Sequence, residues 1–65
     1  MKLQVNLSGS WRDVISFSEI DEAAVKAHAR ELAKIAGAKV SWRVADSQNT
    51  ALARLVPPEY MWRPV

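Results

Sequence analysis

The stretch from Ser18 to Gly37 constrains the fold more than any other part of the chain, because it alone has a clear period, a start signal and a stop signal. Ser18 is a residue type that caps helix N-termini, and Asp21 suits a variant of the capping box. Gly37 can adopt the left-handed conformation that ends helices, and Lys34 lies in the last turn, where a cation is favourable. The sequence therefore predicts a helix over residues 18–37.

The predicted helix is amphipathic. Apolar residues recur at spacings of three and four, which places them on one stripe of a helix, while charged residues recur on another stripe. We expect the apolar stripe to be buried against a sheet and Leu32 to meet Trp42 in the core. The apolar stripe consists of Val25, Ala29, Leu32, Ile35 and Ala36, and the charged stripe of Glu22, Lys26, Arg30 and Lys34.

Residues 1–7 and 11–17 both have the composition of strands, and residues 1–7 alternate between apolar and polar side chains. The turn-forming residues Ser8, Gly9 and Ser10 separate them, so the two stretches are predicted to form a hairpin. One possible register has a two-residue loop and pairs Val5 with Val14, but it sets Leu7 against Arg12.

A three-residue loop instead pairs Leu3 with Ile15 and Leu7 with Trp11. This register places Asp13 on the inner face, and a bulge near Asp13 would relieve that conflict. We favour it because it turns Trp11, Ile15 and Phe17 inward together.

A second hairpin is predicted after the helix. Residues 38–45 alternate strongly, with Val40, Trp42 and Val44 on one face. A four-residue loop over residues 46–49 then sets Val44 against Ala51, Trp42 against Ala53 and Val40 against Leu55, so that large residues meet small ones. Arg43 falls opposite Leu52, and Pro57 and Pro58 end the fourth strand.

These elements predict an α+β fold of ββαββ order, with one helix packed on a four-stranded, mainly antiparallel sheet. Residues 1–56 form the single domain of this prediction, and residues 57–65 form an irregular C-terminal tail rich in proline and aromatic residues.

A chain of 65 residues without cysteine has no disulfides and only a small core, so we expect a partner or a second copy to add stability. No apolar run approaches the roughly 20 residues of a membrane span. The sequence therefore favours a cytoplasmic protein without membrane contact. Nine Lys and Arg against seven Asp and Glu give a net charge of +2, which by itself identifies no partner.

No pattern indicates catalysis or a cofactor. His28 and Glu31 have a spacing that brings two metal ligands together on a helix, but a catalytic zinc usually takes three protein ligands. Gly9 and Gly37 are the only glycines, too few for a phosphate-binding loop. We therefore expect no enzyme, no metal and no cofactor, with metal-dependent activity at His28 and Glu31 as the remaining enzymatic alternative.

Basic residues gather on the predicted open face of the sheet. The predicted alternation places Lys2, Arg12, Arg43 and Arg54 there together with polar residues and no carboxylate. Arginines on such a face can hold phosphates or an acidic partner. Sheet-face RNA binders also use stacking aromatics, however, and the predicted faces turn Trp11, Phe17 and Trp42 inward.

The tail carries Tyr60, Met61 and Trp62 after its double proline. These residues either fold back on the domain or dock into a partner as aromatic anchors. The sequence thus favours a small non-catalytic module for protein–protein interaction, whose partner is an unknown protein or a second copy. The alternative is a nucleic-acid-binding domain that uses the arginine-bearing sheet face.

Overall fold

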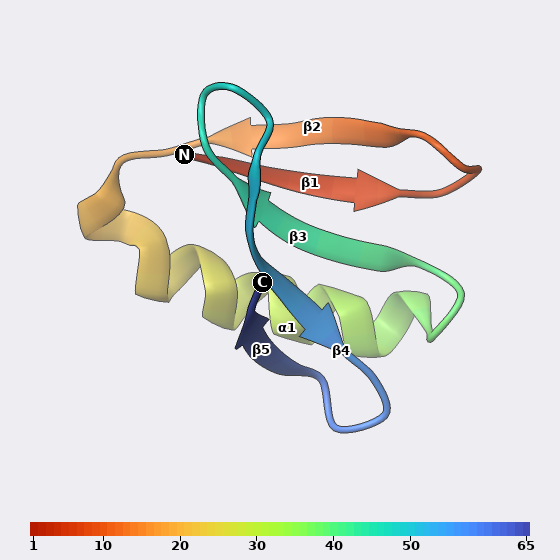
Figure 1. Cartoon of the computed structure of the whole chain (residues 1–65). Coiled ribbons are helices and arrows are strands. Elements are labelled where there is room, and N and C mark those ends of the chain that lie inside the picture. The colour runs from red at the N-terminus through yellow and green to blue at the C-terminus, as the bar shows by residue number, and fades with distance from the viewer.

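One α-helix lies against one face of a five-stranded antiparallel sheet in the computed structural model, which describes residues 1–65 (Figure 1). The strand order is β2-β1-β3-β4-β5. The predicted α+β class is confirmed, whereas the predicted count of four strands is wrong. The elements are β1 (Lys2–Asn6), β2 (Trp11–Ser16), the 3-10 helix η1 (Glu19–Asp21), α1 (Glu22–Ala36), β3 (Ser41–Ala45), β4 (Ala51–Val56) and β5 (Met61–Pro64).

The fifth strand arises from residues that were predicted to form an irregular tail. β5 pairs with β4, with Met61 opposite Val56 and Trp62 opposite Leu55. Pro57 and Pro58 end β4 as predicted, but they lie in the turn and leave the following backbone donors free to pair. Pro64 lies at the end of an edge strand, where a missing backbone donor is tolerated.

The hairpin of β1 and β2 follows the predicted register at one end only. Leu3 pairs with Ile15 as predicted, but Trp11 pairs with Asn6 and not with Leu7. The register shifts between Leu3 and Gln4, which leaves Val14 as the extra residue of a bulge next to Asp13. The predicted position of the bulge is thus confirmed.

This one-residue shift moves side chains to the opposite face of the sheet. Trp11 was predicted to point inward, but it lies on the face away from α1 and contacts Arg43 there. Arg12 was predicted on the open face, but it pairs with Val5, a core residue, and therefore lies on the helix side. The prediction was wrong for both residues because the loop has four residues, Leu7 to Ser10, and not three.

β3 and β4 pair two residues away from the predicted register at Arg43 and Val44, and one residue away at Ala45, where the register shifts. Val44 lies opposite Ala53, and Arg43 lies opposite Arg54 and not Leu52. The connecting loop extends to Thr50, whose carbonyl accepts from the Asp46 N–H at 3.0 Å. Because side chains alternate with a period of two, this change leaves the predicted faces of β3 and most of β4 intact.

The helix begins and ends near the predicted signals. The Ser18 hydroxyl accepts a hydrogen bond from the Ile20 N–H at 3.3 Å, which caps η1, and α1 follows directly. Asp21 makes no capping hydrogen bond with its side chain, so the predicted capping-box variant is absent. Gly37 has a φ of 90° and donates its N–H to the Ala33 carbonyl at 2.9 Å, which ends the helix as predicted.

The buried face of α1 differs from the predicted stripe. Ala29 and Ala33 are the buried residues of the helix, while Leu32 is 50% exposed and Ile35 85% exposed. Compared with the predicted orientation, α1 is rotated about its own axis. The cause is β5, whose Trp62 packs against the helix at Lys26; the predicted four-stranded sheet has no such contact. Leu32 is therefore absent from the buried core that was predicted to join it to Trp42.

The core lies between the centre of the sheet and the face of α1 that carries Ala29 and Ala33. Its buried members are Leu3, Val5, Ala29, Ala33, Trp42, Val44 and Leu55. Two alanines allow the helix to approach the sheet closely but bury little apolar area. In Figure 1 the helix passes behind β4 and β5, while β1 and β2 lie above it in the view. α1 lacks both the length and the apolar character that a membrane-crossing helix requires.

A larger side chain at Ala33, one of the two buried alanines of α1, should push the helix away from the sheet. We expect Ala33→Leu to lower the free energy of unfolding by about 1 to 3 kcal/mol, the usual cost of overpacking. Ala27→Leu is the matched control, because Ala27 is exposed on the same helix and the change should stay within about 0.5 kcal/mol. Denaturant unfolding measures both, and equal effects would show that the wrong face of α1 has been assigned to the core.

Candidate binding surfaces

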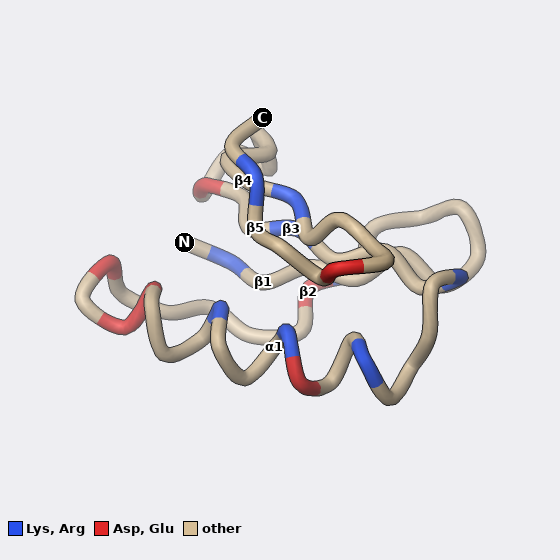
Figure 2. Tube along the Cα trace, turned by 90° about the horizontal axis from the view of Figure 1, so that it is seen from below, with Lys and Arg blue, Asp and Glu red and all other residues tan.

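The sheet face away from α1 carries a row of arginines. Arg43 on β3 pairs with Arg54 on β4, and Arg54 pairs with Arg63 on β5, so the three lie directly opposite one another across adjacent strands. We call this side of the sheet the arginine face. Figure 2 shows the basic segments of β3, β4 and β5 close together in the sheet layer, with the helix in a separate layer.

Trp11 lies among these arginines. The guanidinium carbon of Arg43 is 4.2 Å from the centroid of the Trp11 ring, and that of Arg54 is 5.9 Å away. Both distances are within the range of cation–π attraction. The arginine face therefore holds a large aromatic side chain, which the predicted faces had excluded.

Gln4 connects the arginines to the rest of this face. It is the one buried polar residue, 3% exposed, and its Oε1 accepts from Arg43 Nε at 2.7 Å. Its Nε2 donates to Asp13 Oδ1 at 2.8 Å and to Asn49 Oδ1 at 3.1 Å. Gln4 thereby fixes the guanidinium of Arg43 and ties the β3–β4 loop to β1.

A carboxylate is present on this face, contrary to the prediction. Asp13 accepts from Gln4, and its Oδ2 lies 3.6 Å from Lys2 Nζ. The hydrogen bond from Gln4 is the main cause that lowers the pKa of Asp13 below its ordinary value of 3.8; desolvation opposes it, and the charge and hydrogen bond of Lys2 add to the lowering. Lys2 is thus engaged by Asp13, whereas the three arginines form no ion pair with any carboxylate.

The structure brings together Lys2, Arg43 and Arg54 of the predicted basic residues and separates Arg12 from them. Arg63 was missed. The alternation of Met61 to Pro64 was the available signal, because a strand there places Trp62 inward and Arg63 outward.

The predicted anchors of the tail have unequal surroundings. Trp62 Nε1 donates to the Lys26 carbonyl at 2.9 Å, and the Lys26 ammonium lies 5.7 Å from the Trp62 ring. Arg30 Nε donates to the Tyr60 carbonyl at 2.8 Å. Met61 is 49% exposed on the opposite side of β5. Two of the three residues thus attach β5 to α1, and a partner-binding role for the trio stays a prediction.

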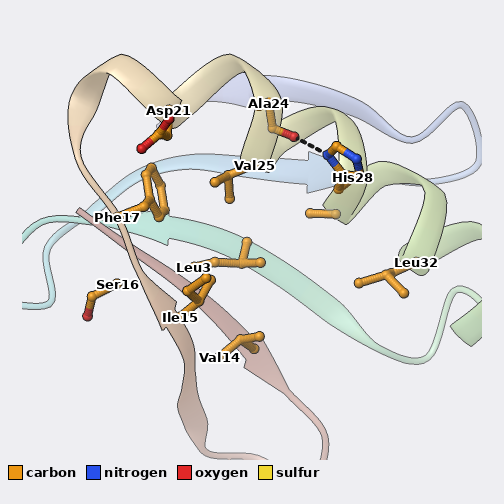
Figure 3. Close-up of a pocket in the computed structure, with 11 residues that line it drawn as sticks. Leu3, Val14, Ile15, Ser16, Phe17, Asp21, Ala24, Val25, His28 and Leu32 are labelled. Carbon is orange, nitrogen blue, oxygen red and sulfur yellow. Dashed lines mark hydrogen bonds between the residues drawn. The ribbon is translucent and has the colours of Figure 1, made fainter.

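An apolar groove of about 650 Å³ runs between α1 and β2 on the helix side of the sheet (Figure 3). It exists because α1 covers β3 and leaves the inner side of β2 open. In Figure 3, Leu32 stands on the helix side, and Val14 and Ile15 stand on the strand side. The lining residues are Leu3, Val14, Ile15, Ser16, Phe17, Asp21, Ala24, Val25, His28, Ala29 and Leu32.

His28 belongs to the wall of this groove. Its Nδ1 lies 2.8 Å from the Ala24 carbonyl of its own helix, and Glu31 is paired with Lys34 at 3.1 Å. The structure contains no group of three or more His, Cys, Asp or Glu residues placed to hold a metal ion. The metal-dependent alternative at His28 and Glu31 gains no third ligand from the fold.

Comparison with protein-family models, curated proteins and solved structures finds no match to this chain. Function must therefore be inferred from the two surfaces themselves.

The Gln4 hydrogen bond can be tested through the titration of Asp13. We expect an NMR titration to place the pKa of Asp13 below 3.8, with Gln4→Met raising it more than Lys2→Met. A carboxyl with a lowered folded pKa adds stability above its unfolded pKa, and this is lost as the pH falls through the folded value. Gln4→Met should therefore lose less stability in acid than the wild type does. An unchanged Asp13 pKa in Gln4→Met would contradict the assigned bond.

The attachment of β5 can be tested at Trp62. We expect Trp62→Ala to lower the free energy of unfolding by about 2 to 3 kcal/mol, somewhat below the usual cost for a fully buried aromatic. Trp62→Phe should cost about 1 kcal/mol, because it keeps a ring but loses the hydrogen bond to Lys26. Met61→Ala is the control on the exposed side of the same strand. Thermal unfolding in which Met61→Ala and Trp62→Ala are equally harmful would show that Trp62 does not hold the helix.

Proposed function

We propose that the protein is a non-catalytic interaction module that acts through protein contact and dimerises along the apolar groove. The supporting observation is a half-exposed helix stripe, which we call the helix seam, beside the open inner side of β2. The helix seam consists of Val25, His28, Leu32 and Ile35. Large apolar side chains that are exposed next to one another on a small domain are typical of an interaction site.

The spacing of the residues in the helix seam favours another helix as the element that packs against it. Its members follow one another at three, four and three residues, which is the pattern that packs one helix against another. Leu32 and Ile35 project from α1 at 50% and 85% exposure, so they are available for such a contact.

The same spacing favours a second copy of this chain. The seam is symmetrical about its midpoint, so a two-fold axis there sets two antiparallel helices against each other. Val25 then lies level with the partner's Ile35, and His28 lies level with the partner's Leu32. Such self-complementary contact is what a two-fold interface requires.

The charges at the ends of the seam agree with this arrangement. Asp21 lies directly before α1, and Lys39 lies shortly after its end, so the same two-fold axis sets Asp21 of one copy near the partner's Lys39. Figure 2 shows acidic segments at the beginning of the helix and mostly basic segments, with one acidic segment among them, further along it. Antiparallel pairing brings the acidic end of each copy to the basic end of the other, while parallel pairing sets like charges together.

The second candidate function is nucleic-acid binding, and it concerns the opposite side of the sheet. The observation that favours it is the position of Trp11 among the arginines. The two functions use different faces and do not exclude each other.

Sedimentation equilibrium tests the dimer. We expect the wild type to form a dimer and Ile35→Glu to be a monomer with almost unchanged stability, since Ile35 is exposed within one chain. Ile20→Glu is the matched control, because Ile20 is 90% exposed but lies outside the helix seam. A wild-type protein that stays monomeric at high concentration would overturn self-association, and equal weakening by Ile20→Glu would remove the seam from the interface.

Exchanging the end charges tests the antiparallel orientation. Asp21→Lys and Lys39→Asp should each weaken the dimer by a factor of a few, the usual effect of an exposed charge pair. The double variant should recover the wild-type dissociation constant, because the complementary charges are restored on both ends. Additive weakening in the double variant would contradict antiparallel pairing.

A further inference from the structure

The row formed by Arg43, Arg54 and Arg63 is unfavourable for the isolated domain. Like charges directly opposite one another on a sheet are destabilising, and here two successive cross-strand pairs are both arginine–arginine. The ion pairs of the structure involve lysines only, so no carboxylate compensates the row. Such an arrangement is stabilised when an external anion binds to it.

The geometry of the row suits several phosphates on one strand. Adjacent strands are about 4.8 Å apart, so the three arginine positions extend across about 10 Å of the sheet. Guanidinium groups bind phosphate oxygens with two parallel hydrogen bonds, which gives direction as well as charge. The row is therefore suited to a chain of phosphates and exceeds what a single phosphate ion needs.

Trp11 offers a stacking surface, which a base can use but a phosphate cannot. It lies half-buried within stacking range of Arg43, and a hollow of about 230 Å³ opens beside it. The walls of this hollow include Trp11, Ser41, Arg54 and Val56. Aromatic rings and guanidinium planes are the surfaces on which unpaired bases stack.

The shape of this face favours a single strand over a duplex. The bases of a duplex are stacked on one another, and reading them requires an element that enters a groove. The arginine face is a sheet surface bounded by the β3–β4 loop, which Asn49 fixes to Lys2 and Gln4 at 3.0 and 3.1 Å. A surface of this kind receives a strand whose bases are free to turn toward it.

We propose that the arginine face is a binding site for single-stranded nucleic acid. Arg43, Arg54 and Arg63 hold consecutive phosphates, and Trp11 stacks with a base at the adjacent hollow. Gln4 Oε1 accepts from Arg43 Nε on the same face, where the Arg43 guanidinium lies over the Trp11 ring. This proposal rests on the second candidate function, nucleic-acid binding. The site lies on the side of the sheet away from the apolar groove, so it does not depend on the proposed dimer.

Fluorescence anisotropy with labelled oligothymidylate and oligouridylate tests this proposal on the full chain. We expect binding at low salt, with log K falling against log salt with a slope near −2 for three phosphate contacts. Arg54→Gln and Arg63→Gln should each weaken binding several-fold and make the slope shallower by somewhat less than one. Trp11→Leu should weaken binding about tenfold at unchanged slope, because stacking releases no counterions.

Arg12→Gln is the matched control. It removes the same charge from an exposed arginine on the opposite side of the sheet, so binding should change little. Equal weakening by Arg12→Gln and Arg54→Gln would mean that only net charge is sensed and would overturn the site. Because Arg12→Gln has the same net charge as Arg54→Gln and Arg63→Gln, the comparison separates binding at a specific site from non-specific electrostatic binding.

Other ligand classes give different results. Tighter binding of a duplex of the same length would overturn the choice of a single strand. If polyglutamate of equal charge displaces the oligonucleotide, and Trp11→Leu binds the oligonucleotide as tightly as the wild type does, the ligand of this face is an acidic protein segment instead. Absence of binding at low salt would overturn the proposal entirely. Thermal unfolding of each variant verifies that the fold is intact, and Arg63→Gln changes an exposed residue whose loss should leave the fold unchanged.

Discussion

A single short helix has to cover a sheet of five strands, and the rest of the molecule follows from this constraint. An α-helix is about 10 Å wide and adjacent strands lie about 4.8 Å apart, so α1 covers about two strand spacings. The buried alanines Ala29 and Ala33 set α1 close to β3, and Trp62 extends that contact toward β5. The inner side of β2 is left uncovered, which creates the apolar groove.

The two faces of the sheet are specialised in different ways. The helix side has an apolar groove with charges at its ends, which suits a helix of matching pattern. The other side has a polar network around Gln4, whose three hydrogen bonds join β1, β2, β3 and the β3–β4 loop. Because this network fixes Arg43 beside Trp11, the arginine face presents an ordered set of groups instead of mobile surface charges.

Features set by neighbouring residues could be predicted from the sequence, whereas features set by distant packing could not. Ser18 and Gly37 bound the helical segment as predicted, and the conflict at Asp13 located the bulge correctly. The faces of Trp11 and Arg12 depend on the length of the loop before them, since one residue exchanges the two faces. The site prediction therefore included Arg12 and excluded Trp11. The buried face of α1 depends on β5. Because Pro57 and Pro58 led to the prediction of an irregular tail, β5 was not predicted, and Arg63 was therefore not included in the site.

The strand order has a consequence for how the chain folds. Three of the four ladders join strands that are consecutive in the sequence, so three hairpins can form from nearby residues. The β1–β3 ladder is the exception, because it brings together strands on either side of the helix. Closing this connection costs the most chain entropy before any contact is gained. We therefore expect the β1–β3 ladder to close after the three local hairpins have formed.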